Sequence, residues 1–201
     1  AQQARAWDIE ANGRKVADAR ETNDHLIIPG SYLVKGENVI RLNFESPILT
    51  SGSAVTRYMD REDKSEYIYT LFVPSDASTA FPCFDQPDLK ARFKLETKTP
   101  NTWKVITNTS EDENNGFVFV VGRPESGVAY HSFRETEPIS TYLFAFAAGP
   151  FEEFKDEATQ FPMRLFVRKS KAERARKEMP EVFRLTREGM KFFSQYFDYK
   201  F

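Results

Sequence analysis

Residues 81 to 91 form the most informative run of the sequence, Phe81-Pro82-Cys83-Phe84-Asp85-Gln86-Pro87-Asp88-Leu89-Lys90-Ala91. Pro82 and Pro87 stiffen this run and remove two backbone hydrogen-bond donors, as suits a loop between strands. We expect Asp85 and Gln86 to hydrogen-bond local backbone groups, because a buried polar group without a partner is costly. The residues by themselves therefore predict a rigid structural elbow, and they indicate no reaction.

Cys83, the one cysteine of the chain, lies in the apolar part of this elbow. We expect a small buried thiol there. A cysteine nucleophile that works with a distant histidine is the alternative. A single cysteine excludes an internal disulfide and leaves the compartment open, either cytoplasmic or exported with a leader removed.

Short apolar runs on both sides of the elbow predict β-strands. Asn12-Gly13 predicts a hairpin turn, and so does Asn115-Gly116. The run from Glu66 to Val73 is apolar on both faces, so we expect it to lie between two layers. Further strands are expected at His25 to Ile28, Val39 to Phe44, Phe93 to Lys98, Trp103 to Thr107, Phe117 to Val121, Tyr130 to Phe133, Thr141 to Ala148 and Met163 to Arg168. This pattern predicts a mainly β fold, an antiparallel β-sandwich or saddle, over residues 1–168.

The pattern changes from strand to helix at Lys169. From Ser170 to Tyr199 the alternation stops, and apolar residues recur at helical spacing, namely Phe183, Met190, Phe193 and Phe197. Pro180 is expected to divide a short first helix from a longer second one. We expect residues 169–201 to be the first helices of a following, truncated domain, with an aromatic stripe that packs poorly without its partner.

Composition excludes some classes of protein. The chain has 201 residues, of which 40% are hydrophobic and 29% charged, as in a soluble globular protein of one domain and part of another. A net charge of −2 argues against a nucleic-acid partner. No window approaches the roughly 18 apolar residues that a membrane span needs, so no membrane partner is expected either.

The sequence contains none of the common motifs of metal, phosphate-binding or serine hydrolase sites. His25 and His131 are its two histidines, and the zinc-binding pattern HExxH is absent, so we predict no metal site. No glycine-rich phosphate loop or GxSxG pattern is present either. Asn108-Thr109-Ser110 fits the glycosylation pattern. The charged runs Glu111-Asp112-Glu113 and Asp60 to Lys64 are expected to be solvated loops.

Motifs along nearly the whole chain resemble those of the aminopeptidase N family of zinc peptidases, which are gluzincin metallopeptidases. The elbow is similar to the family signature FPCFDEP-x-x-KA-x-F, with Gln86 in place of glutamate. The matching positions are Phe81, Pro82, Cys83, Phe84, Asp85, Gln86, Pro87, Lys90 and Ala91. Ile139 to Phe146 resembles the segment MSTYLLAF, and Asn12-Gly13 with Gly36 to Val39 resembles the early NG and LxxGxN elements. The terminal FFSQYFDYKF resembles the helix that precedes the family's catalytic core.

The resemblance implies the amino-terminal domain of an enzyme that removes amino-terminal residues from peptides. In the family, one zinc ion bound through HExxH and a later glutamate activates a water molecule, and a GAMEN loop holds the substrate's α-amino group. These elements lie beyond Phe201, so the chain is expected to be inactive alone. Residues 169–201 would open the thermolysin-like catalytic domain. The implied cofactor is the zinc of the parent protein, and the implied partners are that catalytic domain and peptide substrates. The amino-terminal domain of the family closes one side of the active-site cleft.

Leu71 and Val73 depart from the family pattern. In relatives this segment reads roughly YxYTQFE or TTQxQ, and its polar residue helps to hold the substrate amine. An alignment without gaps places those substrate-binding positions on Leu71 and Val73, whose side chains accept no hydrogen bond. A hydrogen bond to a charged group is worth about 1.5–3 kcal/mol, so we expect binding to be weaker by about tenfold to a hundredfold.

The bond between Val73 and Pro74 has two possible forms. Several relatives have a cis peptide bond directly after their amine-binding residue. In this sequence a proline follows, which lowers the cost of the cis form to about 0.5–1 kcal/mol. The alternative is a trans bond at which Pro74 simply ends the strand.

Two other functions remain open beside the aminopeptidase domain. One is a scaffold or pseudo-enzyme relative that keeps the fold without catalysis, which Leu71 and Val73 favour. The other is an independent carbohydrate- or protein-binding β-sandwich, which the composition alone permits.

Overall fold

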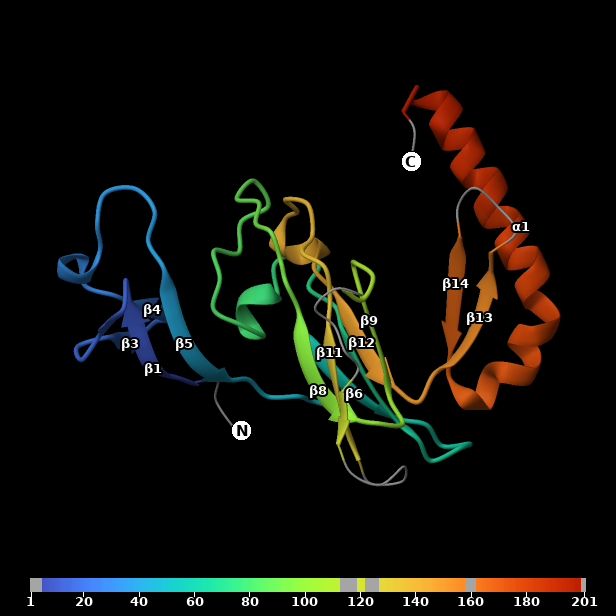
Figure 1. The fold of residues 1–201 in the computed structure, drawn as a ribbon, viewed down its shortest axis with the longest axis horizontal. Coiled ribbons are helices and arrows are strands. Elements are labelled where there is room, and N and C mark those ends of the chain that lie inside the picture. The colour runs from blue at the N-terminus through green and yellow to red at the C-terminus, as the bar shows by residue number, and fades with distance from the viewer. Residues whose placement is uncertain (1–4, 113–118, 122–126, 158–161, 200–201) are drawn as a thin grey trace.

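The computed structural model of the protein describes residues 5–112, 119–121, 127–157 and 162–199. Small sheets follow one another from the amino-terminal strands to one long helix at the carboxy-terminal end (Figure 1). The strand pairs that these residues form are antiparallel. The expected mainly β fold is therefore confirmed. No helix in the described part of the chain is both long and apolar enough to cross a membrane.

The amino-terminal sheet lies at the left of Figure 1. It has the order β2-β1-β5, with a separate hairpin of β3 and β4. The bounds are β1 (Arg5–Ala11), β2 (Arg14–Lys15), β3 (Arg20–Thr22), β4 (His25–Ile27), the 3₁₀ turn η1 (Gly30–Tyr32) and β5 (Ile40–Glu45). Ile9, Ala11 and Val16 form its small core.

Two asparagines join the early family elements within this sheet. Asn12 and Gly13 have φ angles of 54° and 76° and close the β1–β2 hairpin, so the predicted NG turn is confirmed. The Nδ2 atom of Asn12 donates to Oδ1 of Asn38 at 2.9 Å, and its Oδ1 accepts from the backbone N–H of Val39 at 2.9 Å. The NG element and the GxN element therefore hold each other.

Two further sheets form the centre of the molecule. The first has the order β6-β7-β12-β9 and the second the order β10-β11-β8. Their bounds are β6 (Val55–Met59), β7 (Glu66–Thr70), β8 (Glu96–Pro100), β9 (Lys104–Thr107), β10 (Phe119–Val121), β11 (Val128–Ser132) and β12 (Phe146–Gly149). The sheets pack together through Val105 and Ala148 of the first and Phe133, just after β11 of the second. This pair of layers is the sandwich-like part of the fold.

Strand β7 lies between two layers only in part. Ile68 faces the second sheet, as the apolar pattern predicted. On the other face Tyr67 is 2% exposed, with its ring 5.0 Å from that of Phe151, but Tyr69 is 43% exposed. The chain that follows β12 therefore covers only the beginning of this face.

The carboxy-terminal unit is a hairpin with a helix along it. Its elements are β13 (Glu152–Asp156), β14 (Met163–Val167), the 3₁₀ turn η4 (Lys169–Lys171) and α1 (Ala172–Tyr196). Arg187 of α1 forms an ion pair with Asp156 of β13. The expected break at Pro180 is wrong, because this proline lies inside one continuous helix. A proline removes one helical hydrogen bond and kinks the helix, but the turns on either side can continue.

The aromatic stripe of α1 is buried at one end and exposed at the other. Phe183 is 7% exposed, so poor packing is wrong for this residue. Phe193 and Phe197 are 48% and 64% exposed, as expected. Phe192 and Tyr196 lie beside them and are also exposed. The proposed domain boundary after residue 168 stays a prediction.

Two other expectations differ from the structure, and a third is not tested by it. Thr141 to Ala148 is not one strand, because Thr141–Leu143 forms the 3₁₀ turn η3 before β12. Asp60, expected in a solvated loop, is 1% exposed, so that expectation is wrong. The hairpin predicted at Asn115-Gly116 lies outside the described residues.

Gly149 is required where β12 passes β7. A Cβ atom at this position would lie 2.6 Å from Cδ1 of the buried Tyr67 ring. We expect Gly149→Ala to lower the free energy of unfolding by about 1–3 kcal/mol, because the ring has no free space to move into. Urea denaturation measures the change.

The matched control is Gly189→Ala in α1. A Cβ atom at Gly189 meets nothing within 4 Å, so this variant is expected to stabilise the chain by about 0.5–1 kcal/mol through helix propensity. Equal effects of the two substitutions would contradict the close contact between Gly149 and Tyr67.

Candidate functional site

The carboxylate of Asp85 fastens the elbow to two neighbouring segments. Its Oδ2 atom accepts a hydrogen bond from the backbone N–H of Ser78 at 3.0 Å, in the 3₁₀ turn η2 (Ala77–Thr79). Its Oδ1 atom accepts from the hydroxyl of Thr141 at 2.5 Å, in η3. The expectation that Asp85 bonds local backbone is confirmed, and the partner in η3 is an addition. Sequence spacing gave no sign of it, because 56 positions separate the two residues.

The elbow and the segment around η3 make further contacts. Ser140 Oγ donates to the carbonyl of Pro87 at 2.5 Å, and Ala91 and Ile139 exchange two backbone hydrogen bonds of 2.9 and 3.0 Å. Within the elbow, the backbone N–H of Gln86 donates to the carbonyl of Phe84 at 2.9 Å. The two longest motifs of the sequence therefore form one hydrogen-bonded unit.

Residues 71 to 73, called here the Leu71–Val73 edge, follow β7 and present two apolar side chains to solvent. Leu71 is 61% exposed and Val73 54%, whereas Phe72 between them is 2% exposed. The backbone is held by a bond of 2.9 Å from Leu71 N–H to the carbonyl of Ala54. The Val73–Pro74 peptide bond is cis, which is one of the two forms left open by the sequence.

A cluster of aromatic rings joins this edge to the elbow. The Phe72 ring lies 5.7 Å from that of Phe81 in the elbow and 6.4 Å from that of Phe144, just after η3. Phe93 stacks on Phe144 at 4.6 Å. Because Phe72 is anchored in this cluster, Leu71 and Val73 are turned outward on a rigid support.

Residues 81 to 85 of the elbow alternate between half-buried and exposed positions, and residues 86 to 91 are exposed. Phe81, Cys83 and Asp85 are half-buried. Phe81 and Cys83 pack against the core, and Asp85 makes the two hydrogen bonds described above. Pro82, Phe84, Gln86, Pro87, Lys90 and Ala91 are exposed, and the Phe84 ring is 82% exposed. The elbow therefore has one largely exposed aromatic ring of its own, that of Phe84.

Cys83 has the environment of a structural thiol. Burial, together with the negative charge of Asp85, raises the pKa of Cys83 from its ordinary 9.0 to about 11. The thiolate that a nucleophile requires is therefore scarce at neutral pH.

Both histidines are satisfied by other groups. His131 is 6% exposed, and its Nδ1 and Nε2 atoms lie 2.9 Å from Glu111 Oε1 and 3.4 Å from Thr99 Oγ1. Glu111, which we expected in a solvated loop, therefore has a specific partner, and that expectation is wrong for this residue. His25 Nδ1 lies 2.5 Å from the carbonyl oxygen of Asn23. Each histidine is therefore held by ordinary structural contacts.

Asn108, the first residue of the glycosylation pattern, uses its side chain inside the fold. Its Nδ2 atom donates to the carbonyl of Leu143, and its Oδ1 atom accepts from the N–H of Ala145, both at 2.9 Å. Attached sugar would remove one of these bonds, so the geometry argues for a structural role.

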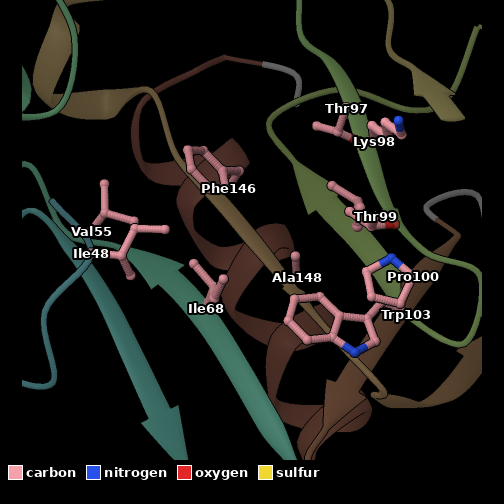
Figure 2. A pocket seen from close by; sticks show the side chains of 11 residues that line it. Ile48, Val55, Ile68, Thr97, Lys98, Thr99, Pro100, Trp103, Phe146 and Ala148 are labelled. Carbon is pink, nitrogen blue, oxygen red and sulfur yellow. The ribbon is translucent and has the colours of Figure 1, made fainter. Parts of the chain in front are cut away.

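An apolar recess of about 370 Å³ lies between the two central sheets (Figure 2). Ile68, Phe146 and Ala148 line one wall, and the threonines of β8 line the other. Thr97 Oγ1 is buried and has no hydrogen-bond partner among the described residues. The recess holds no pair of groups in the described chain that could serve as acid and base.

No group of three or more histidine, cysteine, aspartate or glutamate side chains in the described segments is placed to hold a metal ion. The candidate site is therefore a shaped, apolar surface. It consists of the Leu71–Val73 edge and the elbow that supports it.

Comparison with known proteins gives this surface a context. Residues 5–143 match the model of the peptidase M1 N-terminal domain. The chain is 30% identical over 199 residues to aminopeptidase N of Streptomyces lividans, covering 96% of this chain and 21% of the relative. It is 27% identical over 189 residues to leucyl aminopeptidase of Saccharolobus solfataricus, covering 94% and 22%. With aminopeptidase N of Lactobacillus helveticus it shares 30% identity over 173 residues, covering 84% and 19%. The chain thus spans about a fifth of the length of these relatives.

The raised pKa of Cys83 predicts that its thiol reacts slowly with disulfide reagents. A change from 9.0 to about 11 lowers the thiolate fraction about a hundredfold, so we expect the native chain to react with a disulfide reagent at pH 8 about a hundred times more slowly than the chain in urea. A Cys83→Ser, Lys98→Cys chain supplies an exposed thiol as control. Equal rates for Cys83 and the exposed thiol would contradict its burial.

The two threonines of the recess predict opposite effects on stability. Thr97→Val removes a buried hydroxyl that lacks a partner, and we expect the free energy of unfolding to rise by about 1 kcal/mol. Thr99→Val takes away the hydroxyl that lies beside His131, and we expect a loss of about 0.5–1 kcal/mol. Urea denaturation of both variants tests the pair, and a loss in Thr97→Val would show that its hydroxyl is satisfied.

Proposed function

The chain belongs to the peptidase M1 N-terminal domain family, and we propose that it is the amino-terminal β domain of a zinc-dependent aminopeptidase. The observation that carries the proposal is the family match over residues 5–143, together with relatives that are named aminopeptidases. The hydrogen-bonded unit of Asp85 and Thr141 supports it, because this unit joins the two motifs that resemble the family most closely.

In this proposal the polypeptide continues beyond α1 into a catalytic domain. The relatives are about five times longer than this chain, which leaves room for one. The described residues of this chain do not fit a zinc ion, since they form no group of three ligands. The metal and the groups that activate water would therefore be supplied by the later domain, and this chain would supply a wall.

We place that wall at the Leu71–Val73 edge. Its two side chains are exposed and apolar, and they stand on the buried Phe72 and its aromatic cluster. Phe84 adds a further exposed ring. A rigid apolar surface of this kind is suited to closing one side of a cleft against another domain. The amino end of a peptide bound there would meet side chains that exclude water and accept no hydrogen bond.

A scaffold relative without catalysis is the second candidate. The observation that favours it is the apolar character of positions 71 and 73, where the family places hydrogen-bond acceptors for the substrate amine. Under the first candidate the same positions imply a weak aminopeptidase or one of altered specificity.

The test is the activity and zinc content of the whole protein, with the polypeptide that follows Phe201 included. We expect one zinc ion per molecule and hydrolysis of aminoacyl-anilides that stops when a chelator removes the metal. The 201-residue chain alone is expected to bind no zinc and to hydrolyse nothing. A whole protein without zinc and without activity would favour the scaffold.

Substitution at Val73 tests the wall itself. In the whole enzyme we expect Val73→Glu to lower KM about tenfold to a hundredfold, because a carboxylate would accept a hydrogen bond from the substrate ammonium. Val34→Glu changes a valine of similar exposure, 59%, in the loop between η1 and β5, and is expected to leave KM unchanged. If both variants left KM unchanged, the edge would not touch the substrate.

A further inference from the structure

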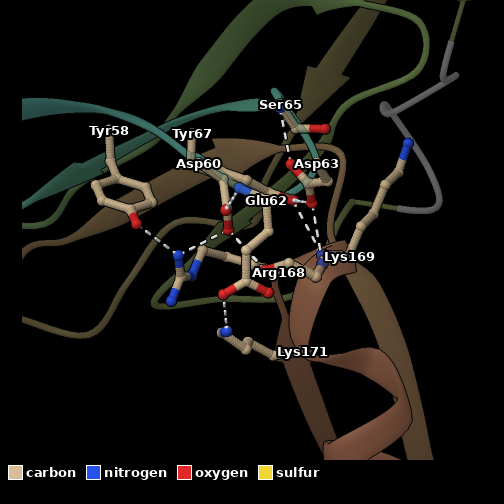
Figure 3. Close-up of polar contacts among 10 residues, drawn as sticks. Tyr58, Asp60, Glu62, Asp63, Ser65, Tyr67, Arg168, Lys169 and Lys171 are labelled. Atoms are coloured by element: carbon tan, nitrogen blue, oxygen red, sulfur yellow. Dashed lines mark hydrogen bonds and ion pairs between the residues drawn. The ribbon is translucent and has the colours of Figure 1, made fainter.

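The loop between β6 and β7 binds the segment that leads into α1 (Figure 3). Asp60, 1% exposed, lies at the centre of this contact. Its Oδ2 atom accepts hydrogen bonds from Arg168 Nη1 and from Ser170 Oγ, both at 2.7 Å. Its Oδ1 atom accepts from the backbone N–H of Glu62 at 2.8 Å. Both oxygens of the buried carboxylate thus accept hydrogen bonds, and two of the three donors are more than 100 positions away in the sequence.

Asp63 and Tyr67 hold the backbone at the beginning of the helical segment. Asp63 Oδ2 accepts from the N–H of Ser170 at 2.9 Å, and the hydroxyl of Tyr67 accepts from the N–H of Lys169 at 3.0 Å. The first N–H groups of a helix have no partner inside the helix. Here the turn η4, which leads directly into α1, receives its partners from the β6–β7 hairpin, and carboxylates stand at its positive end.

Arg168 reaches two residues of the same hairpin at once. Its Nη1 atom also donates to the hydroxyl of Tyr58 at 2.8 Å, and its guanidinium lies 4.8 Å from the centre of the Tyr58 ring. The hydroxyl of Ser170 and the N–H of Glu62 hold the pKa of Asp60 below its ordinary value against the effect of burial, and the charge of Arg168 adds to this. Asp60 is therefore ionised at neutral pH. It pairs with the guanidinium of Arg168, whose orientation is fixed by its contacts with Tyr58.

The carboxy-terminal unit has few other ties to the central sheets. Among the described strands, β13 and β14 pair only with each other. Figure 1 shows α1 running along this hairpin and away from the central sheets. The contacts around Asp60 are thus placed to decide how the whole unit is oriented, together with the contact of Tyr67 and Phe151 and the ion pair of Lys104 on β9 with Glu153 on β13.

We propose that Asp60, Asp63 and Arg168 form a polar latch that fixes the direction in which α1 leaves the β domain, and that Asp60 is a positioning residue for the enzyme. The second part rests on the proposed function, because the polypeptide that follows α1 would then carry the catalytic groups. Strand β7 connects the latch to the Leu71–Val73 edge, since Tyr67 lies near its beginning and Leu71 directly follows its end. One strand thereby relates the direction of α1 to the position of the wall.

The direction of α1 can be measured by pulsed electron paramagnetic resonance on the 201-residue chain. Spin labels are attached to Lys98→Cys on β8 and Glu188→Cys on α1 in the Cys83→Ser background. We expect one narrow distance distribution. Asp60→Ala is expected to broaden it about twofold, because the unit loses its strongest contact with the hairpin.

Arg57→Gln is the matched control. It removes an exposed ion pair with Glu66 in the same hairpin, which does not involve residues 168–171, and the distribution should stay as it was. If Asp60→Ala does not fold by circular dichroism, Arg168→Gln decides instead, since it removes the ion pair from its more exposed partner. An unchanged distribution in whichever of these variants is folded overturns the latch.

Activity of the whole protein tests the second part separately. Asp60→Asn is expected to lower kcat/KM at least about tenfold at unchanged zinc content, with the loss mainly in kcat, whereas Arg57→Gln is expected to have no effect. A broadened distribution without loss of activity would keep the latch and overturn its role in positioning. A whole protein without any activity would overturn the proposed function, and the distance measurement would still decide on the latch.

Discussion

The carboxylate of Asp85 is the constraint on which the candidate site depends. It accepts hydrogen bonds from the backbone of Ser78, seven positions away, and from the hydroxyl of Thr141, 56 positions away, and so joins η2, the elbow and η3. These segments bring Phe81 and Phe144 against Phe72. Because the Phe72 ring is fixed in the core, the side chains of Leu71 and Val73 on either side of it point to solvent. A surface that lacks catalytic groups is in this way given a definite shape.

Strand β7 is the element that relates the two ends of this arrangement. At its beginning, Tyr67 and the loop before it hold the segment that leads into α1. Past its end stands the Leu71–Val73 edge. Gly149 allows β12 to pass close to the Tyr67 ring, so the sheet is tight at the point where the latch is attached. A change at one end of a short, well-packed strand is expected to be felt at the other, since packed sheets transmit displacement.

Local patterns in the sequence predicted what local physics decides. The NG hairpin at Asn12-Gly13, the change from strand to helix near Lys169 and the elbow at residues 81–91 all follow from turn chemistry and periodicity.

Strand β6 (Val55–Met59) was not predicted because its apolar residues do not alternate cleanly. The helix break predicted at Pro180 is wrong because packing of α1 on a hairpin outweighs the loss of one hydrogen bond. The Asp60–Lys64 run looked like solvated charge, since its partners at residues 168–170 lie far along the chain. Of the candidate site, sequence supplied the residues, and only the structure showed how Asp85 and Thr141 bring them together.

A crystal structure of the whole protein with a bound substrate-like inhibitor that carries a free amino group tests the central claim most directly. We expect a zinc ion held by residues beyond Phe201. We also expect the Val73 side chain within about 4 Å of the inhibitor's amino end, with Phe72 buried behind it as in the present structure. An inhibitor bound far from Val73, with this edge open to solvent, would contradict the claim that this domain forms a wall of the active site.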